Sequence, residues 1–344
     1  MINSKRLPLI SVIMPVHNGE AFLTDAIDSI LKQTYTNFEL IILSSANTST
    51  ESLEIISNFK DSRIYHIRRD ANLTYLPAAL NHGIDLSKGE YIARMDSDDI
   101  SLPHRFETQI KFMEEHQEIT IAGSYAKTIG RNPGITMRHP LNHEEIRASL
   151  LFHSSLIHPT VMMRKQILNE LNLRYDPTLE RTEDYEFWYR ASKVVKIANI
   201  PKVLLYYRTH EDQASYKTPE KQAVVRDSIC ADAFGKLGIP LSTDEKALYE
   251  NVRQYRKLSS PEDLLKISEW FLKIDNANET SKVYNQKALQ KVLSQEWLTY
   301  CRLSLKLGKK VKKIFWNSII RSWIKIDLKT IGRIFKFYFL SSAK

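Results

Sequence analysis

The sequence predicts an α/β fold with a mostly parallel sheet flanked by helices, followed by a helical C-terminal extension. Over the first 125 residues, short apolar runs alternate with segments of helical spacing, which is typical of strand–helix–strand units. The apolar runs are unbroken, as expected for strands that are buried on both faces. Beyond Ser215 the pattern is helical.

The predicted elements follow one another in a regular order. The first strand spans Leu9 to Val16, and apolar side chains at helical spacing predict a helix from Glu20 to Gln33. Further strands are predicted at 38–43, 63–67, 91–95 and 119–123, and further helices at 50–59, 76–86 and 103–115. The region 125–215 is mixed, with an irregular or hairpin segment at 130–140 and a strand at 202–207, and a break at 235–240 interrupts the helical part.

Three acidic residues, Asp96, Asp98 and Asp99, follow directly on the predicted strand at 91–95. Carboxylates at this spacing repel one another unless a cation lies among them. Hard oxygen ligands suit Mg²⁺ or Mn²⁺, which take further ligands from water and substrate phosphates. The alternative is a solvated acidic turn that caps the next helix. Because such sheets bind ligands at the carboxyl ends of their strands, the position favours the metal site.

Cysteine usage and hydropathy indicate where the protein works. Cys230 and Cys301 lie far apart without ligand spacing, which excludes a disulfide framework and favours a reducing compartment. No run of 18 apolar residues occurs, so no transmembrane helix is expected. The short apolar stretch near the N-terminus lacks a cleavage site and is not expected to be a signal peptide. A cytoplasmic location follows.

The net charge of +9 is concentrated near the C-terminus, since 12 of the 49 Lys and Arg residues lie between 302 and 344, with a single acid. One helical face of this tail is apolar and the other is basic, as expected for a segment that lies on an anionic membrane. The alternative is a helical subdomain whose apolar face packs on the protein body. Nucleic acid is not an expected partner, because no reader motif accompanies the charge. The apolar face comprises Phe315, Trp316, Ile319, Ile320, Trp323, Ile326 and Ile334.

Four motifs in order resemble those of the family 2 glycosyltransferases. They are SVIMPVHNGE at 11–20, Asn72 with NHG at 81–83, KGEYIARMDSDD at 88–99, and TEDYEFWYR at 182–190. The resemblance covers about Leu9 to Ser215 and implies a Rossmann-like GT-A fold. It also implies an inverting enzyme that moves a sugar from a nucleotide-diphosphate donor to an acceptor hydroxyl.

The resemblance implies a metal and donor site around the acidic cluster. Asp96-Ser97-Asp98 matches the family's DxD motif, so Asp98 is expected to bind Mn²⁺ or Mg²⁺ and Asp96 to contact the metal or the ribose. His210 is expected to complete this site, although an exposed loop histidine remains an alternative. Arg94 could face the nucleotide or pair with the acids. The residues expected to bind the nucleotide-sugar are Pro15, Val16, His17, Glu20, Ser44, Asn81, Arg94, Asp96, Ser97 and Asp98.

Asp184 matches the position of the family's catalytic base. A carboxylate in a dry cleft can accept a proton from a hydroxyl, which suits that role. The alternative is that Glu183 and Asp184 form plain ion pairs with Arg181 and Arg190. The residues expected to contact the acceptor are His158, Thr160, Glu183 and Trp188. For His158, a buried packing role is the alternative.

Two departures from the family pattern bear on specificity. Where the family commonly has two aspartates after the second strand, the first of which accepts a hydrogen bond from uracil, this chain has Ser44 and Ser45. Serine has a shorter reach and no charge. This departure leaves open an altered or shared recognition of the base, a base other than uracil, or a weakened enzyme, and a UDP-sugar remains the favoured donor. Thr74 stands where the family often has glycine, which predicts a local loop change.

These observations predict a catalytic domain at 1–215, a helical subdomain at 216–307 and a membrane-associating tail at 308–344. We expect a metal-dependent hexosyl- or N-acetylhexosaminyl-transferase that acts in surface polysaccharide synthesis. It would lie at the inner face of the cell membrane and use a lipid-linked saccharide as its acceptor. The alternative is a non-catalytic scaffold or partner subunit that keeps the fold.

Overall fold

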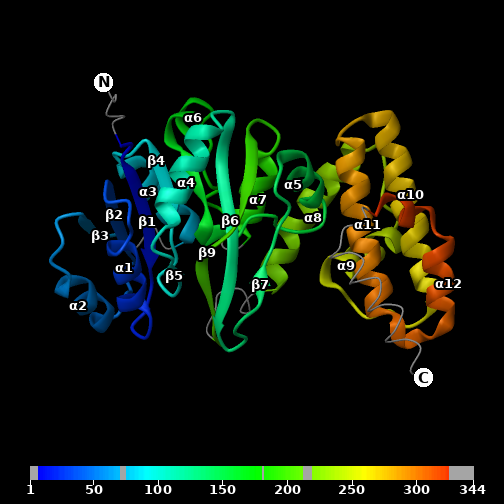
Figure 1. The fold of residues 1–344 in the computed structure, drawn as a ribbon, viewed down its shortest axis with the longest axis horizontal. Coiled ribbons are helices and arrows are strands. Elements are labelled where there is room, and N and C mark those ends of the chain that lie inside the picture. Colours follow the sequence, from blue (N-terminus) through cyan, green and yellow to red (C-terminus); the bar gives the residue numbers. More distant parts are fainter. Residues whose placement is uncertain (1–6, 70–74, 180–181, 212–218, 325–344) are drawn as a thin grey trace. The chain divides into compact units, whose positions relative to one another are not determined.

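The computed structural model describes residues 7–69, 75–179, 182–211 and 219–324 (Figure 1). The chain divides into a first unit, residues 1–146 and 154–226, and a second unit, residues 147–153 and 227–344. The predicted separation of 308–344 as a third part stays a prediction. Thr74, Arg181 and the last 20 residues of the tail lie outside the described residues.

In the described part of the first unit, nine strands form one sheet. Strands β3, β2, β1 and β4 are neighbours in this order and run parallel. Strand β8 runs antiparallel to its neighbours β4 and β6. The predicted α/β class is thereby confirmed, with a parallel half and a mixed half. The strand order is β3 (Ile64–Arg68), β2 (Phe38–Ser44), β1 (Ile10–Val16), β4 (Tyr91–Arg94), β8 (Met162–Arg164), β6 (Ile119–Gly130), β9 (Lys196–Thr209) and β5 (Ile100–Ser101), with β7 (Thr136–Met137) on β6.

The predicted helices of this unit are confirmed, including the 76–86 bounds of α3. Two strands are longer than predicted, because β6 and β9 pair from Ile119 opposite Lys196 to Gly130 opposite Thr209. The apolar run of β6 stops at Gly123, and beyond it buried and exposed residues mix, so the sequence pattern underestimates its length. The helices are α1 (Leu23–Leu31), α2 (Thr50–Asn58), α3 (Leu76–Leu86), α4 (Arg105–Glu115), α5 (His143–Ser149), α6 (Lys165–Glu170) and α7 (Glu183–Ala191), with the 3-10 helix η1 at His158–Thr160.

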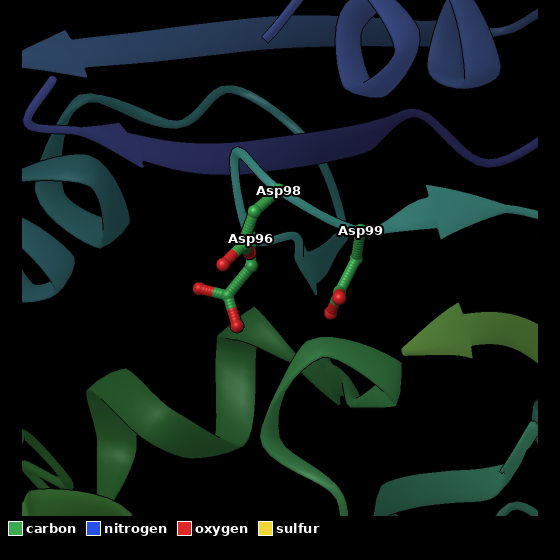
Figure 2. Close-up of side chains that lie close together, drawn as sticks. All are labelled: Asp96, Asp98 and Asp99. Carbon is green, nitrogen blue, oxygen red and sulfur yellow. The ribbon is translucent and has the colours of Figure 1, made fainter. Parts of the chain in front are cut away.

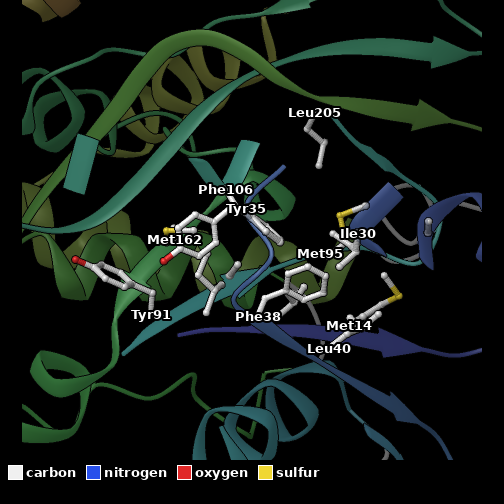
Figure 3. Packing of buried hydrophobic residues seen from close by; sticks show 14 of the residues in the cluster. Met14, Ile30, Tyr35, Phe38, Leu40, Tyr91, Met95, Phe106, Met162 and Leu205 are labelled. Carbon is white, nitrogen blue, oxygen red and sulfur yellow. The ribbon is translucent and has the colours of Figure 1, made fainter. Parts of the chain in front are cut away.

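The core of the first unit explains why β1 is apolar on both faces. Met14 on one face belongs to the cluster with Ile30 of α1 and Phe106 of α4 (Figure 3). On the other face Ile13 packs on α3. A Cβ added to Gly83 of α3 would lie 2.6 Å from the Cγ2 atom of Ile13. Only glycine therefore fits at this closest approach of α3 to the sheet. Because β2, β1 and β4 are parallel neighbours, their carboxyl ends lie at the same edge of the sheet.

The second unit is helical, as predicted beyond Ser215. The predicted break is confirmed, because α8 ends at Lys236 and Gly238 has a φ of +72°. Capping boxes begin α9 at Ser242 and α10 at Ser260, where the serine and an acid three residues later satisfy backbone N–H groups. The helices are α8 (Pro219–Lys236), α9 (Thr243–Gln254), α10 (Pro261–Ser281), α11 (Gln286–Leu303) and α12 (Lys309–Asn317), with 3-10 helices η3 (Leu305–Leu307) and η4 (Ile319–Trp323).

The described part of the tail divides its apolar side chains between packing and exposure. Phe315 and Ile320 are fully buried, and their helices contact α10 and α11. Trp316 and Ile319 are 43% and 60% exposed. The alternative to a membrane-binding tail, in which the apolar face packs within the protein, therefore accounts for only part of this face. None of the helices in the described ranges is long and apolar enough to span a membrane.

Candidate active site

The acidic cluster lies in the loop between β4 and β5, where the carboxylates gather (Figure 2). Asp96, Asp98 and Asp99 each place an oxygen within 4.8 Å of the others. The helix-cap alternative does not describe this loop, because α4 has His104 as its N-cap residue and no side-chain cap. Instead the loop presents three carboxylates at the carboxyl end of a central strand.

Asp99 is the buried member of the cluster. Its Oδ1 atom accepts a hydrogen bond from the backbone N–H of Arg208 at 2.8 Å, and its Oδ2 atom is a buried oxygen with no hydrogen bond in the described structure. Burial, followed by the negative charges of Asp96 and Asp98, raises the pKa of Asp99 well above its ordinary value. Such a cluster is relieved by a divalent cation, so the residues fit one.

Asp96 forms an ion pair with the buried Arg94 of β4. Burial raises the pKa of Asp96, and the negative charges of Asp98 and Asp184 add to the rise, whereas Arg94 opposes it. The negative charge of Asp184, at the start of α7, therefore acts on a cluster that is far from it in the sequence. Arg94 thus pairs with an acid of the cluster, Asp96. This pairing was the alternative to a contact between Arg94 and the nucleotide.

Two residues at the end of β9, Arg208 and His210, contact Asp98 of the cluster. His210 places Nε2 2.9 Å from Oδ2 of Asp98, and the Arg208 side chain donates from Nε to the Asp98 carbonyl oxygen at 2.8 Å. The Arg208 guanidinium also lies over the Phe22 ring, 4.3 Å from its centroid. The structure therefore brings together Asp98 and His210, 112 residues apart, and their oxygen and imidazole ligands suit Mn²⁺ or Mg²⁺.

The ends of β1 and β2 form the neighbouring part of the edge. Nδ1 of His17 lies 2.8 Å from Oγ of Ser45, and Ser44 is fully buried with its hydroxyl 2.9 Å from Nε2 of His66. Glu20 accepts hydrogen bonds from the Ser49 and Ser52 hydroxyls. These contacts fix the loop after β1.

That loop adjoins the acidic cluster. A Cβ on Gly19 would lie 3.5 Å from the Ser97 hydroxyl oxygen, so the predicted residues 15–20 and 96–98 are neighbours. Pro15 and Val16 are at the carboxyl end of β1, paired with Leu43 and Ser44 of β2.

Asn81, by contrast, is engaged elsewhere. Its amide exchanges two hydrogen bonds with the backbone of Tyr175, at 2.8 and 2.9 Å. The Tyr175 hydroxyl lies 2.9 Å from Nε2 of His158, and burial lowers the pKa of His158 well below its ordinary value. Asn81 therefore positions a tyrosine that holds a neutral histidine. An isolated tyrosine gives no motif, so sequence reasoning missed Tyr175.

The two acids of the fourth motif begin α7. Glu183 is buried and Asp184 half-buried. Burial, together with the charge of Asp184, raises the pKa of Glu183 to about 7, and burial also raises the pKa of Asp184. Arg190 pairs with Glu186 at 2.8 Å, so the ion-pair alternative does not hold for that arginine. The arrangement suits a proton acceptor more than a structural ion pair.

The other residues expected at the acceptor lie in the core. Thr160 is fully buried and donates to the Ile157 carbonyl oxygen at 2.7 Å. Trp188 is also fully buried and packs edge-on against the His158 ring. Burial favours a supporting role for both. His158 and Glu183 are neighbours, with Nδ1 3.9 Å from Oε1.

Comparison with known proteins decides the family. The profile described as Glycosyl transferase family 2 matches residues 11–171. An uncharacterised glycosyltransferase of Haemophilus influenzae is 34% identical over 220 residues, which is 60% of this chain and 68% of that protein. The O-antigen biosynthesis glycosyltransferase WbnJ of Escherichia coli is 33% identical over 227 residues, which is 63% of this chain and 84% of that protein.

The chain belongs to glycosyl transferase family 2. The predicted resemblance is thereby confirmed, and the protein has a glycosyltransferase role in a family that includes polysaccharide biosynthesis enzymes. The crystal structure of S. aureus TarS 1–349 in complex with UDP-GlcNAc has the same fold, with a TM-score of 0.57. That alignment covers 86% of this chain and 90% of the TarS chain at 18% identity.

The buried acid of this family 2 glycosyltransferase predicts a pH-dependent stability. The pKa of Glu183 is raised from 4.5 to about 7, so the protonated carboxyl stabilises the fold fully below pH 4.5 and this contribution is lost as the pH rises to 7. The free energy of unfolding should therefore fall over this window by about 3 kcal/mol relative to Glu183→Gln. Urea denaturation in EDTA at several pH values measures the difference.

Asp61→Asn is the matched control. The Arg63 side chain lowers the pKa of Asp61 to about 2, so its stabilisation is complete above pH 4.5 and its variant should differ from wild type by a constant amount. Parallel curves for wild type and Glu183→Gln across the window would contradict the assigned titration of Glu183.

Proposed function

We propose that the protein is a metal-dependent, inverting transferase that moves a hexose or N-acetylhexosamine from a UDP-sugar to a saccharide hydroxyl. The observation that carries this proposal is the acidic cluster, in which Asp96, Asp98 and Asp99 place oxygens within 4.8 Å of one another, with the negative charge of Asp184 near enough to raise the pKa of Asp96. A cation site and a candidate base therefore share one edge of the sheet. Inversion by a single displacement uses a base on the acceptor side of the reacting carbon and stabilisation of the departing diphosphate on the other side, which the cation would supply.

Asp98 and His210, with Asp96 and Asp99, would hold Mn²⁺ or Mg²⁺. When bound, the ion stabilises the negative charge that develops on the departing diphosphate. Asp99 brings its buried Oδ2 atom to this set. Arg94 keeps Asp96 in place through their ion pair, and Arg208 fixes the loop through the Asp98 carbonyl oxygen.

Asp184 is proposed as the base. It accepts the proton of the acceptor hydroxyl while the hydroxyl oxygen forms its bond to the anomeric carbon. The bond from that carbon to the diphosphate oxygen breaks, and its electron pair leaves with the diphosphate. Because burial raises the pKa of Asp184, its carboxylate is a stronger base than an exposed aspartate. Glu183, with a pKa of about 7, limits the negative charge beside it.

The donor and acceptor classes have support from relatives. TarS was solved with UDP-GlcNAc, which favours a uridine diphosphate sugar here. WbnJ carries an O-antigen biosynthesis name, which favours a surface saccharide, and we propose that this saccharide is linked to lipid at the inner face of the cell membrane.

Incubation with a panel of nucleotide-sugars, with and without Mn²⁺, tests the activity. Release of the nucleoside diphosphate, dependent on Mn²⁺, from at least one sugar is the expected result. If no sugar is transferred or hydrolysed and calorimetry detects no metal-dependent binding of UDP, GDP, CDP or dTDP, the non-catalytic scaffold is the better description.

The exposed part of the tail supports the membrane proposal. Trp316 and Ile319 project from α12 and η4, and Lys309 and Lys313 are exposed on the same helix. An exposed aromatic residue beside lysines suits the headgroup region of an anionic membrane. Trp316→Ser with Ile319→Ser is expected to reduce binding to phosphatidylglycerol vesicles about tenfold, measured by flotation.

Leu265→Ser supplies the control, because Leu265 is 40% exposed on α10 of the same unit. It should leave flotation unchanged. If the tail variant and wild type float equally with the vesicles, α12 and η4 do not contact the membrane.

A further inference from the structure

Arg105, the first residue of α4, is a fully buried arginine. Its guanidinium donates from Nη2 to the Arg94 carbonyl oxygen at 2.8 Å and from Nε to the side-chain oxygen of Gln109 at 2.9 Å. Its Nη1 atom lies 3.6 Å from Sδ of Met95. These partner atoms belong to neutral groups, so dipoles rather than a carboxylate hold the guanidinium here.

The guanidinium keeps its positive charge at neutral pH. Burial, followed by the positive charge of Arg94, lowers the pKa of Arg105 to about 9, and the negative charge of Asp99 opposes this change. A buried charge without an opposite charge beside it destabilises a fold, whereas an apolar side chain of similar volume does not. The contribution of Arg105 therefore lies in the groups that its hydrogen bonds join.

Arg105 and Gln109 together hold two segments that are far apart in the sequence. Through the Arg94 carbonyl oxygen, Arg105 fixes the end of β4, which Asp96 follows closely. Gln109 is also fully buried, and its Nε2 atom donates to the Thr160 carbonyl oxygen at 2.8 Å, at the end of η1. The pair of Arg105 and Gln109, called the α4 clamp below, thus joins the strand before the acidic cluster to η1.

η1 in turn contacts the helix that carries the proposed base. The His158 ring of η1 packs edge-on against Trp188 of α7, with 5.7 Å between the ring centroids. Nδ1 of His158 lies 3.9 Å from Oε1 of Glu183, the residue before Asp184. A continuous series of contacts therefore leads from the end of β4 through the α4 clamp and η1 to the start of α7.

We propose that the α4 clamp holds the metal side and the base side of the active site at the separation that sugar transfer requires. This inference rests on the proposed function, and it makes Arg105 and Gln109 positioning residues that lie behind the site. A single displacement needs the acceptor oxygen, the anomeric carbon and the departing oxygen in line, so a shift of the base relative to the cation slows the transfer. Donor binding through the metal side is affected less.

Arginine suits this task because its N–H groups lie in one plane and point in fixed directions, so that they reach Arg94 and Gln109 at once. A lysine keeps the positive charge but has a single nitrogen, which does not reproduce this fork. The proposal therefore separates geometry from charge, and Arg105→Lys should behave like Arg105→Met.

Single-turnover transfer, with calorimetry of UDP binding in Mn²⁺, tests the proposal in Arg105→Met, Arg105→Lys and Gln109→Leu. Each variant is expected to lower the single-turnover rate about 10²-fold, the loss that a misplacement of about 1 Å produces. The Kd of UDP should stay within about threefold of the wild-type value. Gln109→Leu leaves the buried charge in place, so it decides the outcome if Arg105→Met does not fold.

Ser11→Ala is the matched control for the loss of buried hydrogen bonds. The Ser11 hydroxyl is buried, donates to Oε1 of Glu39 at 2.6 Å and accepts from the Gly89 backbone N–H at 2.8 Å. These groups lie at the amino ends of β1, β2 and β4, on the opposite edge of the sheet from the acidic cluster. The Tm should fall as in Gln109→Leu, while the single-turnover rate stays within about threefold of wild type.

The outcomes distinguish this inference from the proposed function. If wild type transfers sugar with Mn²⁺ and Gln109→Leu does so at the same rate, the α4 clamp has no positioning role and the proposed function stands. A wild-type rate in Arg105→Lys, or an equal loss of rate in Ser11→Ala, also overturns the positioning role. A wild-type protein that transfers no sugar overturns both.

Discussion

Asp184→Asn is expected to reduce kcat for sugar transfer by about 10³-fold, because an amide cannot accept the hydroxyl proton. The substitution keeps the size of the side chain, so the Kd of the donor should stay within about threefold. Single-turnover transfer assays and calorimetry with UDP measure the two quantities. Since burial raises the pKa of Asp184, wild-type activity should also fall at acidic pH as the carboxylate is protonated.

Glu186→Gln is the matched control for this variant. Glu186 lies on the same helix, two residues further on, and its carboxylate pairs with Arg190 at 2.8 Å. Its loss should leave kcat within about threefold, because Glu186 forms a partly exposed ion pair with Arg190 and has no assigned role in the proton transfer. Near-normal turnover by Asp184→Asn would assign the base to another group, with Glu183 as the first candidate.

Asp98→Ala is expected to weaken metal-dependent donor binding by at least about 100-fold, because it removes a carboxylate ligand and leaves His210 without its partner. Calorimetry with UDP and Mn²⁺ measures the loss. Wild type treated with EDTA should bind UDP as weakly as the variant does. The variant's residual binding should no longer respond to added Mn²⁺.

Asp28→Asn provides the comparison for charge alone. Asp28 is an exposed carboxylate of α1 that pairs with Lys32 at 2.9 Å, so its loss changes the net charge by the same amount without touching the cluster. Donor affinity should stay at the wild-type value. Equal Mn²⁺ dependence in wild type and Asp98→Ala would show that the acidic cluster does not bind the metal.

The strands and the acidic cluster could be predicted because their signals are local. The apolar run before Val16 marks a strand buried on both faces, and Asp96 to Asp99 follow another such strand without a gap. A hydrophobic pattern of this kind reports burial directly. The cluster's place at the carboxyl edge then follows from the parallel arrangement of the strands, which β1, β2 and β4 have.

The supporting contacts of the site could not be predicted in the same way. Tyr175 holds His158, and Arg208 fixes Asp98 and Asp99, yet neither residue lies near its partner in the sequence. The burial of Thr160 and Trp188 was equally hidden, because a polar or aromatic residue in a motif looks the same in a core as in a cleft.

The sequence by itself determined the α/β class, the family and the residues that supply charge to the site, because spacing and side-chain type carry this information along the chain. Only the tertiary structure decided which groups meet: Asp98 with His210, Asp99 with Arg208, and His17 with Ser45. The raised pKa values of the acids arise from burial and from neighbours that folding brings together. These properties depend on distances in space, which a linear pattern does not record.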